Sequence, residues 1–345
     1  MKNTIIVVVI AMLLLASACQ AQPQVLTVMT HDSFAVSEEL VAQFEQQHQV
    51  KLNFLLSGDT GSALNRAVLA KKAPIADVFY GVDNTFLSRA LAEEIFEPYK
   101  SPMLANIPDE FKLDAGNHAL PVDFGDVCIN YDKAYFAGQA LALPASLEDL
   151  TLPQYAGLLV VENPATSSPG LAFLLATIAE YGPEAYLEYW QRLKDNNLVI
   201  VNDWETAYLS NFSGSSGKGA QPMVVSYGTS PAAEMVFAEE ELTEAPTASL
   251  VGVNMCFRQV EFVGILKGTR QRALAEQFVD FMLDKPFQED IPMQMFVFPL
   301  NRQVQLPEAF MNSVQVPAQP AVLPMDVIES GREGWIEAWR QLMLQ

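Results

Sequence analysis

One tyrosine stands where a predicted strand gives way to a predicted helix, a position from which it could contact a ligand. The stretch 224–233 reads V-V-S-Y-G-T-S-P-A-A, so apolar residues lead into Tyr227 and helix-starting residues follow it. The hydroxyl of Ser230 can cap the first turn, and Pro231 suits the first helical position. Open α/β sheets bind ligands at the carboxyl ends of their strands. The alternative is a tyrosine packed half in the core, and this segment alone leaves both interpretations open.

Strands and helices alternate regularly in the N-terminal third of the chain. Three apolar runs, at 25–29, 51–55 and 76–80, are each followed by a polar loop and a helical pattern. Asn84 is expected to cap the third helix. Such alternation favours parallel strands with helices on both faces, which is an α/β fold.

The alternation breaks at 119–131, where two short β runs flank the tetrapeptide Asp123-Phe124-Gly125-Asp126. We interpret this region as the crossing into a second lobe. Strands and helices alternate again from residue 158, and a long β run over 256–267 is expected to carry the chain back. The prediction is an α/β protein of two lobes with a ligand cleft between them. Residues 23–123 and 262–345 are assigned to lobe 1, and residues 124–261 to lobe 2.

The N-terminus is typical of a secretory signal. Lys2 precedes the apolar run 5–15, which is too short to span a bilayer, and small residues at 16–18 follow it. We therefore predict a signal peptide over 1–22 and an exported protein. Cys19 directly after the small residues is typical of a bacterial lipoprotein, in which its thiol would carry the lipid that anchors the protein. Ordinary cleavage, for example after Ala21, is the alternative.

The charge balance limits the classes of partner. Lys and Arg total 20 against 41 Asp and Glu, a formal net charge of -21. This field repels nucleic acid and favours cationic small ligands. Only three histidines occur, and their spacing to the cysteines matches no zinc site. We expect no metal.

Two cysteines, Cys128 and Cys256, remain in the mature chain, each in an apolar strand-like run. An exported pair can form a disulfide, but nothing in the sequence shows that the two are close. The apolar surroundings favour two buried thiols.

Several segments, in their order and spacing, resemble the thiamine-binding protein of bacterial ABC transporters, and the similarity extends over nearly all of the mature chain. These segments are Thr30-His31-Asp32-Ser33-Phe34, Leu64-Asn65-Arg66, Ala76-Asp77-Val78, Tyr131-Asp132-Lys133, N-P-A-T-S-S-P-G-L at 163–171, W-E-T-A-Y at 204–208, Ser226-Tyr227-Gly228-Thr229-Ser230-Pro231 and Gln259-Val260-Glu261. The resemblance implies a type II periplasmic-binding-protein fold that closes over one ligand and delivers it to a membrane permease. It further implies a monomer that is not an enzyme and needs no cofactor.

The resemblance also implies the site, in which aromatic rings and polar groups surround thiamine. Tyr227, Trp204 and Phe296 match ring positions, while Asp59 and Ser167 match polar contacts. Ring faces attract a permanent cation such as thiazolium, and carboxylates near the site would add complementary charge. The remaining candidates are His31, Asp32, Thr60 and Glu205.

Two positions depart from the family pattern. Ala233 replaces a tyrosine, and His31 replaces another aromatic residue. The ligand is therefore expected to be thiamine, a thiamine phosphate or a related cationic heterocycle.

Three alternatives of the same fold stay open at this point. A thiaminase-like enzyme would use Cys128 as nucleophile with Glu205 or Glu261 as base. The others are a ferric-ion binder and a polyamine binder.

Overall fold

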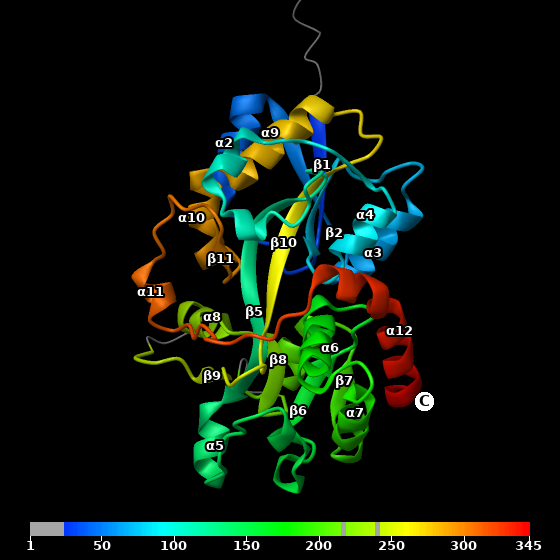
Figure 1. The fold of residues 1–345 in the computed structure, drawn as a ribbon. Helices are drawn as coiled ribbons and strands as arrows, with labels where there is room; N and C mark the ends of the chain where they lie inside the picture. The colour runs from blue at the N-terminus through cyan, green and yellow to red at the C-terminus, as the bar shows by residue number, and fades with distance from the viewer. Residues whose placement is uncertain (1–23, 215–218, 239–241) are drawn as a thin grey trace, which may run out of the picture.

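Two long antiparallel strands, β5 (Leu120–Asp132) and β10 (Phe257–Leu266), run through both halves of the molecule (Figure 1). The structure is a computed structural model that describes residues 24–214, 219–238 and 242–345. The strand order in the sheet is β2-β1-β3-β10-β5-β8-β6-β7. β10 and β5 therefore stand at the centre of the order, with one half of the molecule on each side.

The first half is built on parallel strands β1, β2 and β3. The predicted alternation of strand and helix is confirmed here, since β1 pairs in parallel with both β2 and β3. The elements of this half are β1 (Gln24–Thr30), α2 (Glu38–His48), β2 (Val50–Leu56), α3 (Thr60–Leu69), β3 (Val78–Asp83), α4 (Leu87–Ala92), β4 (Phe96–Glu97), η1 (Pro102–Asn106), η2 (Asp109–Phe111), α9 (Arg272–Leu283), α10 (Lys285–Gln294) and β11 (Phe298–Pro299).

The second half surrounds β6, which lies parallel to both β7 and β8. Helix α6 (Ser168–Tyr181) is buried along most of its length, as its almost wholly apolar sequence requires. The other elements are α5 (Lys133–Gln139), η3 (Glu148–Thr151), η4 (Pro153–Tyr155), β6 (Leu159–Glu162), α7 (Tyr186–Asp195), β7 (Val199–Val201), the π-helical η5 (Thr206–Asn211), β8 (Met223–Tyr227), α8 (Ser230–Val236), β9 (Thr247–Leu250) and α11 (Glu308–Met311).

The last helix, α12 (Met325–Met343), connects the two halves (Figure 1). On the second half, Trp339 packs edge-on against Trp190 of α7, with 5.5 Å between ring centroids. On the first half, the buried Arg332 donates to the Thr85 carbonyl and the Ser88 hydroxyl next to α4. The predicted two-lobed α/β class is confirmed, while the predicted lobe boundaries stay a prediction.

The prediction of two short β runs at 119–131 is wrong, because one continuous strand, β5, spans them. The buried acidic groups in its middle find partners on neighbouring strands. Asp126 accepts two hydrogen bonds from Arg258 of β10, both at 2.9 Å, and Asp123 accepts one from the Tyr80 hydroxyl at 2.6 Å. Partners far along the chain therefore offset part of the desolvation cost that these buried acidic groups bring to the strand.

Two predicted helix caps are also wrong. Helix α4 begins after Phe86, and the amide of Asn84 instead bonds with the backbone of β10 at Arg258 and Val260. Ser230 already belongs to α8, and its hydroxyl lies 2.9 Å from that of Ser226. In both cases the polar side chain bonds with a group outside the helix, and not with the helix end that the local pattern predicted.

The prediction of two buried thiols is wrong, because Cys128 and Cys256 form a disulfide. Both residues are buried, and the bridge joins the middle of β5 to the residue just before β10. Because 128 residues separate the two cysteines, the sequence alone does not show that strand pairing brings them together.

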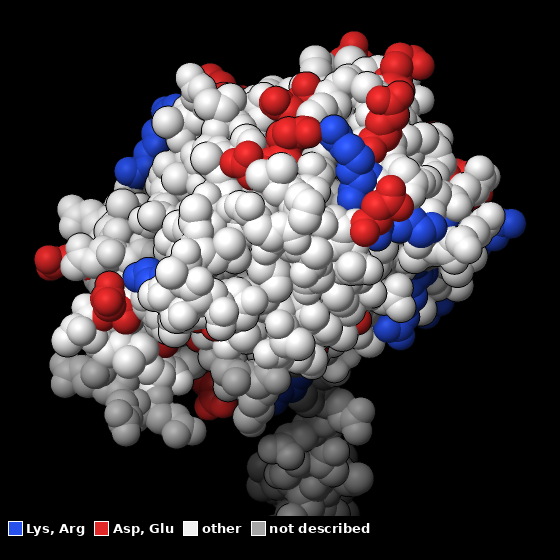
Figure 2. All heavy atoms as spheres, turned by 90° about the horizontal axis from the view of Figure 1, so that it is seen from below, with Lys and Arg blue, Asp and Glu red and all other residues white. Residues whose placement is uncertain are grey.

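Within residues 24–214, 219–238 and 242–345, no helix has the length and apolar character needed to cross a membrane. Figure 2, a view from the lower end of Figure 1, shows a face formed mostly by uncharged residues, with charged side chains toward its margin. The predicted signal peptide and lipid attachment at Cys19 lie outside the described residues.

Removing the disulfide is expected to destabilise the fold. A Cys128→Ser/Cys256→Ser variant, made in a Cys19→Ala background, should lose about 2 to 4 kcal/mol of unfolding free energy, because its unfolded chain is no longer cross-linked. Thermal unfolding followed by circular dichroism measures the loss. As a control, reductant should lower the melting temperature of the parent and leave that of the variant unchanged. Two titratable thiols in the unreduced, unfolded parent would contradict the disulfide.

Candidate functional site

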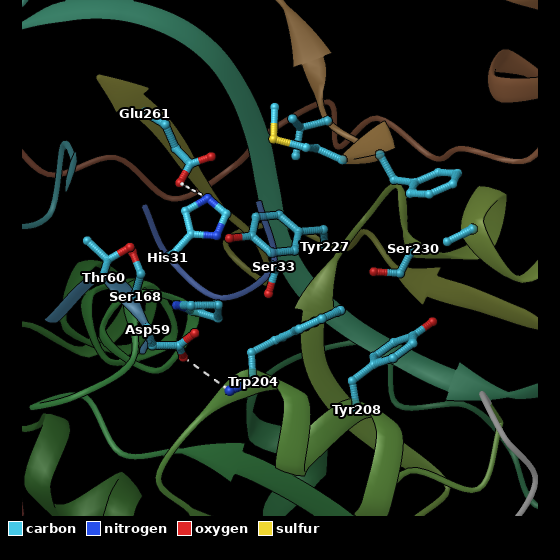
Figure 3. A pocket seen from close by; sticks show the side chains of 15 residues that line it. His31, Ser33, Asp59, Thr60, Ser168, Trp204, Tyr208, Tyr227, Ser230 and Glu261 are labelled. Atoms are coloured by element: carbon cyan, nitrogen blue, oxygen red, sulfur yellow. Dashed lines mark hydrogen bonds and ion pairs between the residues drawn. The ribbon is translucent and has the colours of Figure 1, made fainter. Parts of the chain in front are cut away.

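A cavity of about 100 Å³ lies between the two halves, beside the crossing strands (Figure 3). Both halves contribute to its wall: loops after β1 and β2, strand β10 and the segment after α10 come from the first, and α6, η5, β8 and α8 from the second. The lining residues are His31, Ser33, Asp59, Thr60, Ser168, Pro169, Trp204, Tyr208, Tyr227, Ser230, Ala233, Glu261, Met295, Phe296 and Val297.

Trp204 and Tyr208 form a stacked aromatic pair on the second half. Their ring centroids are 5.1 Å apart and their planes differ by 16°. The indole N–H of Trp204 donates to the Ser226 hydroxyl at 2.9 Å, and the Tyr208 hydroxyl donates to Glu234 at 2.7 Å. Because both polar tips are engaged, the rings are held in place before any ligand arrives.

Tyr227 lies at the end of β8, as the sequence predicts, and its ring packs over Gly125 of β5. A Cβ at Gly125 would come within 2.7 Å of the Tyr227 ring, so only glycine leaves room there. The Tyr227 hydroxyl donates to Gln259 at 3.2 Å. The tyrosine is thus tied to both crossing strands.

Phe296 reaches the cavity from a strained backbone. Its φ is 55°, in the left-handed region that bulky residues rarely adopt. The ring packs edge-on against Phe237, with 5.4 Å between centroids. Strain of this kind is often retained at binding sites.

Asp59 directly connects the two halves. It stands just before α3 of the first half, and its carboxylate accepts a hydrogen bond from the backbone N–H of Trp204 of the second half at 3.1 Å. Burial raises the pKa of Asp59, an effect that the Trp204 hydrogen bond partly offsets. Beside it, Thr60 donates to the Gly81 carbonyl at 2.8 Å and so fixes the start of the helix.

Two carboxyl groups meet below the cavity, on the crossing strands. Glu261 of β10 pairs directly with Asp123 of β5, and the Tyr80 hydroxyl lies 2.6 Å from Asp123 and 3.1 Å from Glu261. His31 Nε2 lies 3.5 Å from the other oxygen of Glu261 (Figure 3). Burial raises the pKa of Asp123 well above its usual value and that of Glu261 to about 7, while it lowers the pKa of His31.

A third buried carboxyl group belongs to the same network. Asp83 of β3 also pairs with Glu261, and its carboxylate accepts a hydrogen bond from Gln259 at 2.6 Å. Burial raises the pKa of Asp83 to about 6. Gln259 also bonds with the Ser168 hydroxyl at the start of α6. Polar contacts thus extend from the first half through β10 to the second.

The structure brings together six of the nine candidate ligand residues and leaves three outside the cavity wall. Those in the wall are His31, Asp59, Thr60, Trp204, Tyr227 and Phe296. Asp32 is exposed and accepts from the Gly58 N–H at 2.7 Å, Glu205 is exposed at the start of η5, and Ser167 is fully buried beneath Ser168 and Pro169. The ligand-binding role of all nine stays a prediction.

Sequence reasoning left out three cavity residues that matter for its chemistry: Tyr208, Ser168 and Glu261. Tyr208 follows Trp204 by four residues, the spacing that stacks side chains on a helix, and this signal was readable. Glu261 alternates with Gln259 in an apolar strand, so two polar side chains in that run share one face.

The chemistry of the wall suits a cation that carries aromatic rings. Trp204, Tyr208, Tyr227 and Phe296 supply aromatic rings, and Asp59 and Glu261 supply carboxyl groups. No lysine or arginine is among the described residues that line the cavity. Among the residues that the structure describes, no group of three or more His, Cys, Asp or Glu side chains is arranged so that it could hold a metal ion. The site therefore favours an organic cation over a metal ion or a polyanion.

Two α/β lobes joined by crossing strands, with one cavity between them, define the class of two-lobed solute-binding proteins. A family model described as bacterial extracellular solute-binding protein matches residues 73–330. The chain belongs to this family, and the resemblance noted in the sequence is confirmed.

The relatives include proteins named for thiamine. The thiamine-binding periplasmic protein of Brucella suis is 31% identical over 332 residues, covering 94% of this chain and 93% of its own. That of Salmonella typhimurium is also 31% identical, with 96% of each chain covered. The solved structure of a periplasmic thiamin binding protein has a TM-score of 0.81 at 27% identity, covering 94% of this chain and 98% of that one.

A side chain at Gly61 is expected to hold the lobes apart. A Cβ there would lie 3.0 Å from the Thr166 carbonyl oxygen of the second lobe and 3.1 Å from that of Ala165. Gly61→Val should therefore increase the radius of gyration measured by small-angle X-ray scattering. Gly138→Val is the matched control, since a Cβ at Gly138 has nothing within 4 Å. An unchanged radius in Gly61→Val would show that the lobes close without this contact.

Proposed function

We propose that the protein captures thiamine, or a thiamine phosphate or related cationic heterocycle, and delivers it to the permease of an ABC transporter. The cavity supports this most directly, because the rings of Trp204, Tyr208 and Tyr227 line the same space as the carboxyl groups of Asp59 and Glu261. The curated relatives of similar length carry the name thiamine-binding periplasmic protein.

The proposed ligand matches both the aromatic rings and the carboxyl groups that line the cavity. Thiazolium is a permanent cation, and a well-placed ring face attracts such a cation by about 0.5 to 2 kcal/mol. The carboxylates on the opposite wall complement the same charge. The aminopyrimidine ring offers further donors and acceptors, which the hydroxyls of Ser33 and Ser230 can meet. A ligand that contacts both walls stabilises the closed arrangement.

The alternatives receive less support from the site. Cys128 lies in a buried disulfide and so has no thiolate to act as a nucleophile. A ferric ion would be bound by phenolate oxygens, yet the hydroxyls of Tyr208 and Tyr227 both donate hydrogen bonds to protein groups. Calorimetry with thiamine, its phosphates, spermidine and ferric citrate separates these ligands. Absence of heat with every thiamine compound would refute the proposal.

Loss of either ring is expected to weaken thiamine binding. Trp204→Ala and Tyr227→Ala should each cost about 1 kcal/mol or more of binding free energy if the rings face the cation. Isothermal titration calorimetry measures the dissociation constants. Trp204→Phe and Tyr227→Phe are the matched controls, because each keeps a ring and loses only the polar tip. Near-native affinity in both alanine variants would place the aromatic contact elsewhere.

We further propose that the protein is exported to the periplasm or cell surface and anchored by lipid at Cys19. The charged, apolar and small-residue segments that end at Cys19 support this. A protein anchored in this way stays at the membrane in which its permease lies.

Replacing the proposed lipid-bearing residue should release the protein. In a Gram-negative host, the wild-type chain is expected in the membrane fraction and Cys19→Ala in the soluble periplasmic fraction, because the variant lacks the thiol that would carry the lipid. Immunoblots of separated fractions measure the distribution, and Glu188→Gln, at an exposed position on α7, serves as the control. Equal solubility of wild type and Cys19→Ala would show ordinary signal cleavage.

A further inference from the structure

Among the residues that the structure describes, no lysine or arginine pairs with the buried Asp123 and Glu261 to neutralise two negative charges. Glu261 is 8% exposed and Asp123 is 0% exposed. The two lie opposite each other on paired strands, with the Tyr80 hydroxyl near both. A phenol donates only one proton, so it cannot satisfy two carboxylates at once. Two carboxyl groups so close in a dry site hold a proton between them until positive charge arrives.

Every other titratable group around Glu261 either adds negative charge or stays neutral. Asp83 of β3 and Asp59 before α3 both disfavour its ionised form. Tyr80 of β3 and Tyr227 of β8 are phenols whose pKa burial raises well above the usual value, so they remain neutral. His31, after β1, is the one basic neighbour among these residues, and burial lowers its pKa. The pair therefore lacks a protein cation.

Glu261 lines the cavity, whereas Asp123 lies behind it on the neighbouring strand. A ligand cation that enters the cavity thus comes close to the Glu261 carboxyl group of the pair. Figure 3 shows the Glu261 carboxyl group beside His31 at the wall of the site.

We infer that Asp123 and Glu261 form a proton-linked receptor for the ligand's positive charge, in which binding of the cation expels the proton that the pair holds into solvent. The inference rests on the proposed cationic ligand. It assigns Glu261 as the counter-ion in the bound state and Asp123 as the positioning residue whose carboxyl group, paired with Glu261 across the strands, orients that counter-ion.

Release of a proton on binding determines the direction in which ligand affinity changes with pH. The free protein holds the proton below the pKa of the pair, and the complex does not, so affinity must rise with pH in that range. The rise approaches about tenfold per pH unit well below the pKa and levels off above it. With the pKa of Glu261 raised to about 7, the change falls in the neutral range.

Calorimetry with thiamine in phosphate and Tris buffers at pH 6, 7 and 8 tests this. The difference in heat between buffers of different ionisation enthalpy counts the protons released. We expect release approaching one proton per ligand at pH 6 and clearly less at pH 8. Binding with the same heat in both buffers at every pH would overturn the inference and leave the proposed function intact. Absence of any thiamine binding would overturn both.

Two variants separate this role from a structural one. Asp123→Asn should shift the pH range in which protons are released, because it replaces the carboxyl group that hydrogen-bonds with Glu261. Glu261→Gln should lose proton release and bind about tenfold more weakly, since the counter-ion is gone. Glu188→Gln, at an exposed position on α7, is the matched control for net charge and should behave as wild type. Unchanged proton release in both cavity variants would assign the proton to the ligand and overturn the inference.

Discussion

The site depends on the burial of acidic groups where the crossing strands pass beside the cavity. Asp83, Asp123 and Glu261 lie on three adjacent strands, at paired positions, and water reaches them poorly. Charges in such a place are costly unless they are paired. The fold supplies neutral donors, namely Tyr80 and Gln259, in place of cations. This leaves an unmet preference for positive charge at the wall of the cavity, which a cationic ligand satisfies.

The two walls of the cavity belong to different lobes and carry different chemistry. The loop before α3 and strand β10 contribute the carboxyl groups of Asp59 and Glu261, and the segment after α10 contributes the ring of Phe296. The other side contributes Trp204, Tyr208 and Tyr227. Asp59 already contacts Trp204 across the gap, so binding and closure share residues. A ligand that prefers both walls favours the closed arrangement by its difference in affinity for the two states. Ligand recognition therefore coincides with the lobe closure that a permease would detect.

Local patterns predicted much of this architecture, and their failures share a cause. Strand and helix alternation placed Tyr227 at a strand end and gave the α/β class, because periodicity and strand ends are local features. Asn84 and the Asp123–Asp126 segment were misassigned since their polar groups bond with residues far along the chain. Ser230 was misassigned because its hydroxyl lies against that of Ser226 in the preceding strand. A single sequence does not show such partners.

By itself, the sequence determined the two-lobed α/β class, the family and three aromatic residues of the cavity, Trp204, Tyr227 and Phe296, because these follow from periodicity and from motifs of neighbouring residues. Only the tertiary structure decided that Cys128 and Cys256 are bonded, that Asp32, Ser167 and Glu205 lie outside the cavity wall, and that Glu261 faces the ligand space beside Asp123. The physical reason is that strand register and lobe closure bring together groups more than a hundred residues apart, and desolvation at that meeting point sets their chemistry.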